Sequence, residues 1–164
     1  MSAAPVPEAV VVVVSTRAAA GTRPDTTGPD LINRLKAAGW DVVREPRVVP
    51  DDETRLVTLL RELAGRYRLI VTTGGTGLTP TDRTPEATIK AGDRQVPGIA
   101  EMIRAAGLAT TPLAALSRGM VVTRGQALIV NLPGSPRGAA QSLEAAIPVL
   151  RHAVDQLGGG DHHG

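Results

Sequence analysis

The clearest chemical pattern in this sequence is a glycine-rich segment, residues 74–77 (GGTG), which follows the apolar run at residues 69–71 after two threonines. Further along, Thr84-Pro85-Glu86 has the pattern of a helix start, with Thr84 as the N-cap and Pro85 in the first helical position. A strand, a glycine turn and a helix N-terminus together bind anions, because backbone N–H groups converge there and the helix dipole favours negative charge. The segment therefore predicts a phosphate-binding loop.

Two aspartates add a metal to this prediction. Asp82 lies in the same loop, and a carboxylate that faces a phosphate is repelled unless a cation lies between them. Asp51-Asp52 follows the apolar run that ends at Val49; one acid is expected to cap the next helix, which leaves Asp51, nearer the strand end, free. Two carboxylates at adjacent strand ends can hold Mg²⁺ through oxygen and water ligands. The structural alternatives are a helix cap for Asp51 and a self-bonded turn for Asp82.

Known phosphate motifs do not account for the glycine loop. A Walker A loop needs a Gly-Lys-Ser/Thr ending, and no such lysine is present. A dinucleotide fingerprint begins at Gly75-Thr76-Gly77, but Pro80 stands where its third glycine belongs. The remaining structural alternative is a tight turn that needs glycine at positive φ.

Three further motifs follow or precede predicted strands. Residues 133–136 (PGSP) fit either a helix start, with Ser135 as the cap, or a second anion site made by the N–H groups of Gly134 and Ser135. Arg118, after Ser117, is either a solvated surface charge or a bidentate phosphate clamp. The first strand ends at residues 15–17 (STR).

The elements that must position these motifs alternate between strand and helix. Apolar runs predict strands at residues 9–15, 41–49, 69–73, 119–123 and 127–132. Helical spacing predicts helices near residues 29–38, 50–64, 85–91, 99–106 and from 136 onward, with a kink or a lost hydrogen bond at Pro148. The pattern predicts a three-layer α/β domain with a mostly parallel sheet, helices on both faces and an antiparallel hairpin in the C-terminal part. Ligands of such sheets bind at the carboxyl ends of the strands.

Composition limits the function classes. The chain has 164 residues, which indicates one domain, and we expect it to comprise a flexible arm (1–8), a single α/β domain (9–157) and a disordered tail (158–164). It lacks cysteine, so thiolate metal sites are excluded. A net charge of +2 and an aromatic content of 1% argue against a general nucleic-acid binder. The apolar run at residues 9–14 is too short for a signal peptide or membrane span, so we expect a cytoplasmic protein without a membrane partner.

Four segments together resemble the molybdenum-cofactor biosynthesis proteins of the Mog and MoaB type, a group that includes the gephyrin and plant G domains. The segments are residues 72–88 (TTGGTGLTPTDRTPEAT), 48–52 (VVPDD), 115–119 (ALSRG) and 132–136 (LPGSP). The resemblance implies a mixed sheet between helices, assembled as a homotrimer. It also implies that ATP with Mg²⁺ adenylylates molybdopterin and that pyrophosphate is released.

The same resemblance assigns roles to residues. It implies that Asp51 and Asp82 are the catalytic residues and the Mg²⁺ ligands. It implies substrate binding by Gly74, Gly75, Thr76, Gly77, Ser117, Arg118, Pro133, Gly134 and Ser135. One departure is Thr16, because the family often has Ser-Asp after the first strand; Asp25 matches the family's next acidic segment conservatively.

The sequence leaves two rival functions open. The first is a molybdopterin-binding scaffold without catalysis, and the two acids argue against it, because a pure binder of an anion has no use for them. The second is a nucleotide or dinucleotide sensor, and the missing third glycine argues against it. A molybdenum-insertion protein is a candidate partner, and His162 and His163 in the tail are candidate weak metal ligands.

Overall fold

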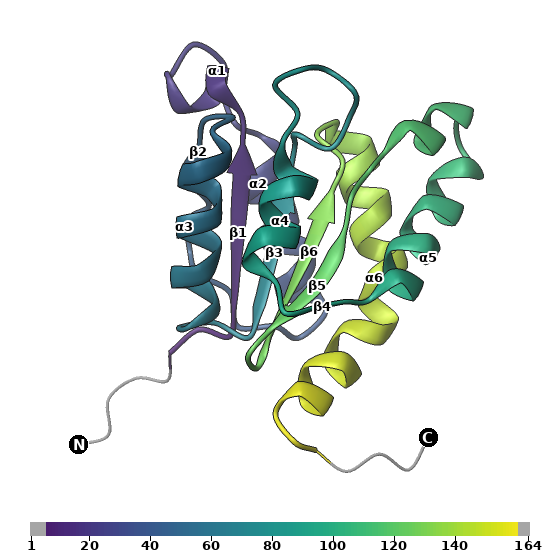
Figure 1. Cartoon of the computed structure of the whole chain (residues 1–164). Helices are drawn as coiled ribbons and strands as arrows, with labels where there is room; N and C mark the ends of the chain where they lie inside the picture. Colours follow the sequence, from purple (N-terminus) through teal and green to yellow (C-terminus); the bar gives the residue numbers. More distant parts are fainter. Residues whose placement is uncertain (1–5, 161–164) are drawn as a thin grey trace.

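A six-stranded sheet in the order β2-β1-β3-β6-β5-β4 forms the centre of the molecule (Figure 1). This computed structural model describes residues 6–160. Strands β1, β2, β3 and β6 are mutually parallel, whereas β5 runs antiparallel to both of its neighbours, β6 and β4. The strands are β1 (Ala9–Val14), β2 (Arg47–Val49), β3 (Leu69–Thr73), β4 (Arg94–Gln95), β5 (Val121–Arg124) and β6 (Ala127–Leu132). The predicted mostly parallel sheet with a hairpin near its C-terminal part is confirmed.

Helices cover both faces of the sheet. The helices are α1 (Thr16–Ala19), α2 (Thr27–Ala37), α3 (Glu53–Ala64), α4 (Thr84–Ala91), α5 (Pro97–Leu108), the 3-10 helix η1 (Pro112–Leu116) and α6 (Pro136–Leu157). Buried side chains of α2, α5 and α6 pack on one face of the sheet, and those of α3 and α4 pack on the other. The molecule therefore has the three predicted layers.

The apolar run of β1 explains this layering. All six of its residues are buried. Successive side chains of a strand point to opposite faces. Accordingly, Val11 and Val13 join the cluster with α2 and α6, whereas Val10 and Val12 join the cluster with α3. A continuous β-branched sequence is what a strand covered on both faces requires.

The register brings the carboxyl ends of four strands to one edge of the sheet. Val14 pairs with Val49, Val13 pairs with Thr73, and Thr73 pairs with Leu132. The residues that follow these strands are therefore neighbours, although they come from distant parts of the chain. This edge carries the candidate site.

The structure corrects three local predictions. The second strand spans only Arg47–Val49, because Pro46 has no N–H to continue the ladder and residues 41–46 contribute a single bridge, between Val42 and Ala9. A helical turn, α1, replaces part of the predicted loop after β1. Thr84 is the first residue of α4 instead of its N-cap, and Arg83 precedes the helix without a side-chain cap.

Pro148 does not end α6, which continues to Leu157. Its ring lies on the exposed side of the helix, where a carbonyl group that loses its helical partner can bond to water. The buried face of α6 is the predicted apolar stripe, including Leu143, Leu150 and Val154.

Glu8, the last residue of the predicted flexible arm (1–8), is held by contacts with the rest of the protein. Arg151 donates two hydrogen bonds to the Glu8 carboxylate, at 3.2 and 3.1 Å, and its guanidinium lies 3.7 Å from the centroid of the Trp40 ring. Residues 1–5 of the predicted arm and 161–164 of the predicted tail, with His162 and His163, lie outside the described residues.

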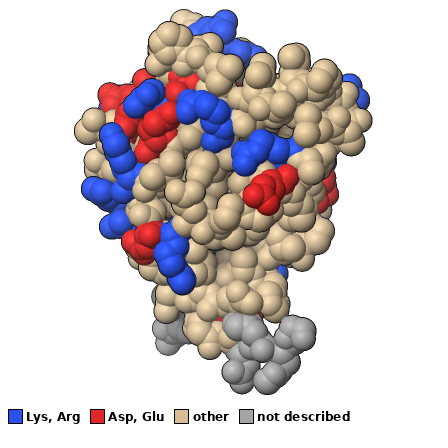
Figure 2. Space-filling view, turned by 45° about the vertical axis from the view of Figure 1, so that its right-hand side comes forward, with Lys and Arg blue, Asp and Glu red and all other residues tan. Residues whose placement is uncertain are grey.

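The surface carries both signs of charge. On the face in Figure 2, basic and acidic side chains are interspersed instead of forming one continuous patch. Among residues 6–160, no helix has the length and apolarity needed to cross a membrane.

Candidate active site

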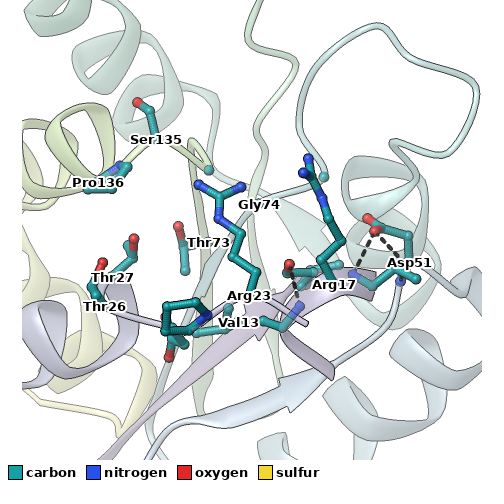
Figure 3. Close-up of a pocket in the computed structure, with 18 of the residues that line it drawn as sticks. Val13, Arg17, Arg23, Thr26, Thr27, Asp51, Thr73, Gly74, Ser135 and Pro136 are labelled. Atoms are coloured by element: carbon teal, nitrogen blue, oxygen red, sulfur yellow. Dashed lines mark hydrogen bonds between the residues drawn. The ribbon is translucent and has the colours of Figure 1, made fainter. Parts of the chain in front are cut away.

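A cavity of about 600 Å³ lies at the carboxyl edge of the sheet, bounded by the ends of β1 and β3 and by the loops that follow them (Figure 3). Asp51 and Asp82 both line it. A second cavity, of about 460 Å³, lies on the other side of the glycine loop and has an apolar wall that includes Leu113 and Leu116. Four residues line both cavities: Gly75, Asp82, Gly134 and Ser135. Two adjoining cavities with one shared wall can hold two reacting molecules end to end.

Two glycines set the shape of the loop. Gly74 has a φ of 100°, and a Cβ there would lie 2.3 Å from the carbonyl oxygen of Val14. Gly75 has a φ of 69°, and a Cβ there would lie 2.3 Å from Oγ1 of Thr84. Positive φ and close backbone approach both require glycine. The tight-turn interpretation is therefore correct for the backbone, but it does not account for the donors that the turn exposes.

The loop presents N–H groups without acceptors. Within residues 6–160, no hydrogen bond uses the N–H of Gly75, Thr76 or Gly77, although Thr76 is only 5% exposed. The N–H groups of Gly134 and Ser135 are also unused in the described part of the chain. A buried N–H without a partner is costly, so such groups mark a place for a ligand or ordered water. These two sets of donors are predicted by the sequence.

The two donor sets lie against each other. A Cβ on Gly134 would lie 3.2 Å from the Cα of Gly74, so only glycine lets the β6–α6 turn approach the loop this closely. Ser135 caps α6 through its side chain, with its Oγ accepting from the N–H of Gly138 at 3.1 Å. Capping and anion binding are compatible here, because the cap uses the hydroxyl group and leaves the Ser135 N–H available.

Asp51 is free of helix capping, as the sequence predicts. Asp52 takes that role, with its Oδ1 accepting from the N–H of Arg55 at 3.1 Å. Oδ2 of Asp51 accepts from Thr16, at 3.2 Å from the backbone N and 2.9 Å from Oγ1. Oδ1 of Asp51 faces the glycine loop, where a Cβ on Gly75 would lie 3.4 Å from it. One carboxylate oxygen is thus fixed and the other is directed at the phosphate loop.

Asp82 makes the turn contact that the sequence offered as its structural alternative. Its Oδ2 accepts from the N–H of Thr79 at 3.1 Å, and its own N–H donates to the Thr79 carbonyl at 3.0 Å. Gly77 makes room for the carboxylate, since a Cβ there would lie 2.9 Å from Oδ2. Oδ1 has no partner among the described residues. The turn contact therefore orients the carboxylate and leaves one oxygen for a ligand.

Arg118 holds the glycine loop in place through three contacts. Its Nε donates to the Gly77 carbonyl at 2.8 Å, its Nη2 donates to the Asp82 carbonyl at 2.9 Å, and its Nη1 pairs with Glu86. Burial is the largest single influence on Glu86 and disfavours its charged form, but the hydrogen bond from Arg118, a backbone hydrogen bond and the charges of Arg118 and Arg83 together hold the pKa of Glu86 below its ordinary value. The guanidinium lines neither cavity, so it acts on the site by positioning Gly77 and Asp82. Its neighbour Ser117 lines the second cavity.

A polar group beneath the loop was missed by the sequence reasoning. Asn131 donates to Oγ1 of Thr72 and to Oγ1 of Thr88, each at 2.9 Å, and all three residues are buried. Thr73 donates to the carbonyl of Pro133 at 2.6 Å and so links the loops after β3 and β6. The sequence signal for this group was Asn131 itself, a polar residue near the end of the otherwise apolar strand β6. This group fixes the two donor sets relative to each other.

The donor chemistry fits a magnesium ion that is shared with a substrate. The described residues contain no group of three or more acidic, histidine or cysteine side chains that would hold a metal by themselves. Mg²⁺ usually keeps several waters and takes one or two carboxylates together with substrate phosphates. Asp51 and Asp82, each with one oxygen free, match that requirement.

Comparison with known proteins identifies the family of this chain. Residues 10–152 match the family model described as "Probable molybdopterin binding domain". The chain is 40% identical to the molybdopterin adenylyltransferase of Haemophilus influenzae over 137 residues, which is 82% of this chain and 70% of the relative. The MoaB structure from Thermus thermophilus superposes with a TM-score of 0.83 at 48% identity, covering 93% of this chain and 97% of that one. A MogA structure gives a TM-score of 0.86 at 42% identity, covering 92% and 99%. The chain therefore belongs to the molybdopterin-binding domain family of molybdenum-cofactor biosynthesis.

Proposed function

We propose that this protein is a molybdopterin adenylyltransferase, which transfers the adenylyl group of ATP to the terminal phosphate of molybdopterin and releases pyrophosphate. The observation that carries the proposal is the pair of adjoining cavities with unused N–H donors on their shared wall. Relatives named molybdopterin adenylyltransferase, at about 40% identity over most of the chain, support the same activity.

The cavities differ in a way that favours one substrate for each. The first has Asp51 and two arginines, Arg17 and Arg23, on its walls, and it suits the more highly charged ATP. The second has Ser117 and an apolar wall, and it suits the pterin ring system. The α-phosphate of ATP and the terminal phosphate of molybdopterin then meet at Gly75 and Gly134, where the free N–H groups lie.

The reaction asks for little covalent chemistry from the protein. The attacking oxygen belongs to a phosphate that is already anionic, so no side chain has to remove a proton from it. The N–H groups of Gly75 and Gly134 orient the phosphates and stabilise the charge that develops on the oxygens of the α-phosphorus. Asp51 and Asp82 would hold Mg²⁺, which supplies charge neutralisation between the phosphates when it is bound.

The cellular setting is proposed on the resemblance alone. A homotrimer, a cytoplasmic location and transfer of the product to a molybdenum-insertion protein follow from the family pattern. Sedimentation equilibrium of the purified chain tests the trimer, and a monomer at micromolar concentration would contradict it.

The activity test combines the protein with molybdopterin, ATP and Mg²⁺ and measures both pyrophosphate and adenylylated molybdopterin. We expect the two products in equal amounts, and no pyrophosphate when molybdopterin or Mg²⁺ is left out. The alternative of a non-catalytic scaffold predicts molybdopterin binding with neither product. Arg44→Ala is a matched surface control, because Arg44 is exposed and follows Val42, which pairs with the opposite end of β1.

A further inference from the structure

Two arginines on the wall of the first cavity, Arg17 and Arg23, have so far been given no specific contact with a substrate. Arg17 lies on α1, and Arg23 lies on the loop that follows it. Figure 3 shows both side chains extending from this segment in the same direction, with Arg17 on the side of Asp51. Both residues line the first cavity together with Gly74 and Gly75 of the glycine loop.

The backbone that carries the arginines is held in place. Oγ of Ser15 accepts from the N–H of Ala18 at 3.2 Å and so caps α1. The carbonyl of Arg17 accepts from both the N–H and the Oγ1 of Thr22, at 3.0 and 3.1 Å. Arg23 is followed by Pro24, which restricts its backbone to extended conformations. Both side chains thus start from fixed positions at the cavity rim.

The protein supplies no partner for either guanidinium. Among residues 6–160, the ion pairs use Arg34, Arg83, Lys90, Arg118 and Arg151 as the cations. Arg17 and Arg23 make neither an ion pair nor a side-chain hydrogen bond in that part of the chain, although Asp51 and Asp82 line the same cavity. Like charges on one cavity wall repel each other, and a polyanion that binds between them relieves the repulsion. Arginine suits this role because its planar fork binds phosphate oxygens in pairs.

We propose that Arg17 and Arg23 form the subsite for the two terminal phosphates of ATP, an inference that rests on the proposed function. With the α-phosphate at the shared wall, the β- and γ-phosphates extend into the first cavity, because the second has an apolar wall. In the transfer step, an oxygen of the molybdopterin phosphate forms a bond to the α-phosphorus. The bond from that phosphorus to the oxygen that bridges it to the β-phosphate breaks. The electron pair leaves on pyrophosphate, whose added negative charge the two arginines stabilise.

The test uses calorimetry with pyrophosphate, ATP and AMP as separate probes, together with turnover. The double variant Arg17→Ala/Arg23→Ala should weaken pyrophosphate and ATP binding at least tenfold, leave AMP binding within about twofold, and lower turnover on the order of a hundredfold. Arg17→Lys/Arg23→Lys should recover part of the affinity, because a lysine keeps the charge without the fork. Arg44→Ala removes one exposed positive charge at the far end of β1 and should match the wild type.

The outcomes separate the subsite from the activity. If the wild type forms the product and the double variant binds pyrophosphate as tightly as the wild type does, the subsite is wrong and the proposed function stands. If the wild type forms no product but binds pyrophosphate in an arginine-dependent way, the subsite stands and the proposed function fails. An equal loss of AMP and pyrophosphate binding in the double variant overturns the subsite, since the arginines would then be recognising something other than the terminal phosphates.

Discussion

Thr16 and Asp51 hold each other through a reciprocal pair of hydrogen bonds. Oγ1 of Thr16 donates to the Asp51 carboxylate at 2.9 Å and accepts from the Asp51 N–H at 3.1 Å. The backbone N–H of Thr16 adds a third contact at 3.2 Å. These bonds join the ends of β1 and β2 and direct the other carboxylate oxygen toward the glycine loop. The hydroxyl group of Thr16 therefore has a structural function at the site.

The first prediction concerns this contact. Thr16→Val removes the hydroxyl at nearly constant volume, so Asp51 loses two of its three hydrogen bonds with Thr16 and is oriented less firmly while the fold remains. We expect about a tenfold higher Mg²⁺ requirement and a similar loss of turnover, as for other groups that orient a metal ligand. Thr16→Ser keeps the hydroxyl and should behave like the wild type. A Mg²⁺ titration of activity for the three proteins is the measurement, and an unchanged titration for Thr16→Val would refute the positioning role.

The second prediction concerns the two carboxylates. Asp51→Asn and Asp82→Asn should each lower turnover by about a hundredfold or more, because an amide is a poor Mg²⁺ ligand and does not compensate its charge. Both variants should keep their melting temperature and their affinity for molybdopterin, which is placed in the second cavity. Stopped assays with binding measured in parallel test this. Wild-type turnover in either variant would remove that residue from the metal site.

The third prediction concerns the backbone of the loop. Gly75→Ala should destabilise the protein by about 1–3 kcal/mol, because φ is 69° and the new Cβ would lie 2.3 Å from Oγ1 of Thr84. Gly98→Ala is the matched control: it lies in α5 with nothing within 4 Å of the added Cβ, and alanine favours a helix. Urea unfolding of the two variants compares the costs. Equal stabilities would mean that the loop relaxes to accept a side chain.

The elements that the sequence predicted well are those with continuous apolar runs. Strands β3 and β6 begin and end where expected, since a strand buried on both faces allows few polar residues. The predicted ends of β2, β3 and β6 then indicated that Asp51, Asp82 and Gly134 lie at one edge of the sheet. Short exposed elements were missed, including β4 with its two exposed residues and the helical turn α1. Strand β4 is held by its pairing with β5, a distant segment that local pattern does not record, whereas α1 is capped locally by Ser15.

The hydrogen-bond partners of side chains at the site could not be predicted from the local sequence either. Arg118 was predicted as a surface charge or a phosphate clamp, and its contacts with Gly77 and Glu86 depend on the fold bringing residues more than 30 positions apart together. The same holds for Asn131 beneath the loop, whose partners come from β3 and α4. Spacing identified which residues gather at the sheet edge. Only the structure shows which of their polar groups bond to other parts of the protein and which are left for a ligand.

The last prediction is a pH dependence that arises at Glu86. Burial has the largest single effect and raises its pKa, but the hydrogen bond from Arg118, a backbone hydrogen bond and the charges of Arg118 and Arg83 together lower it by more, so the pKa of the folded state lies below that of the unfolded chain. The stabilisation from the ion pair is therefore fully present above the ordinary glutamate pKa of about 4.3, and it is lost as the pH falls through the lower folded value. Glu86→Gln lacks this dependence and should lose less stability than the wild type on going from pH 6 to pH 3.

Melting temperatures of both proteins across that range test the prediction. Glu53 provides an internal comparison, because hydrogen bonds from Lys90 and Arg83 lower its pKa as well. The double variant Glu53→Gln/Glu86→Gln should therefore show a flatter acid limb than either single variant. Since Arg118 also binds Gly77 and Asp82, we expect phosphate binding to weaken over the same pH interval in which the Glu86 contact is lost. Parallel acid limbs for the wild type and Glu86→Gln would show that this ion pair does not stabilise the loop.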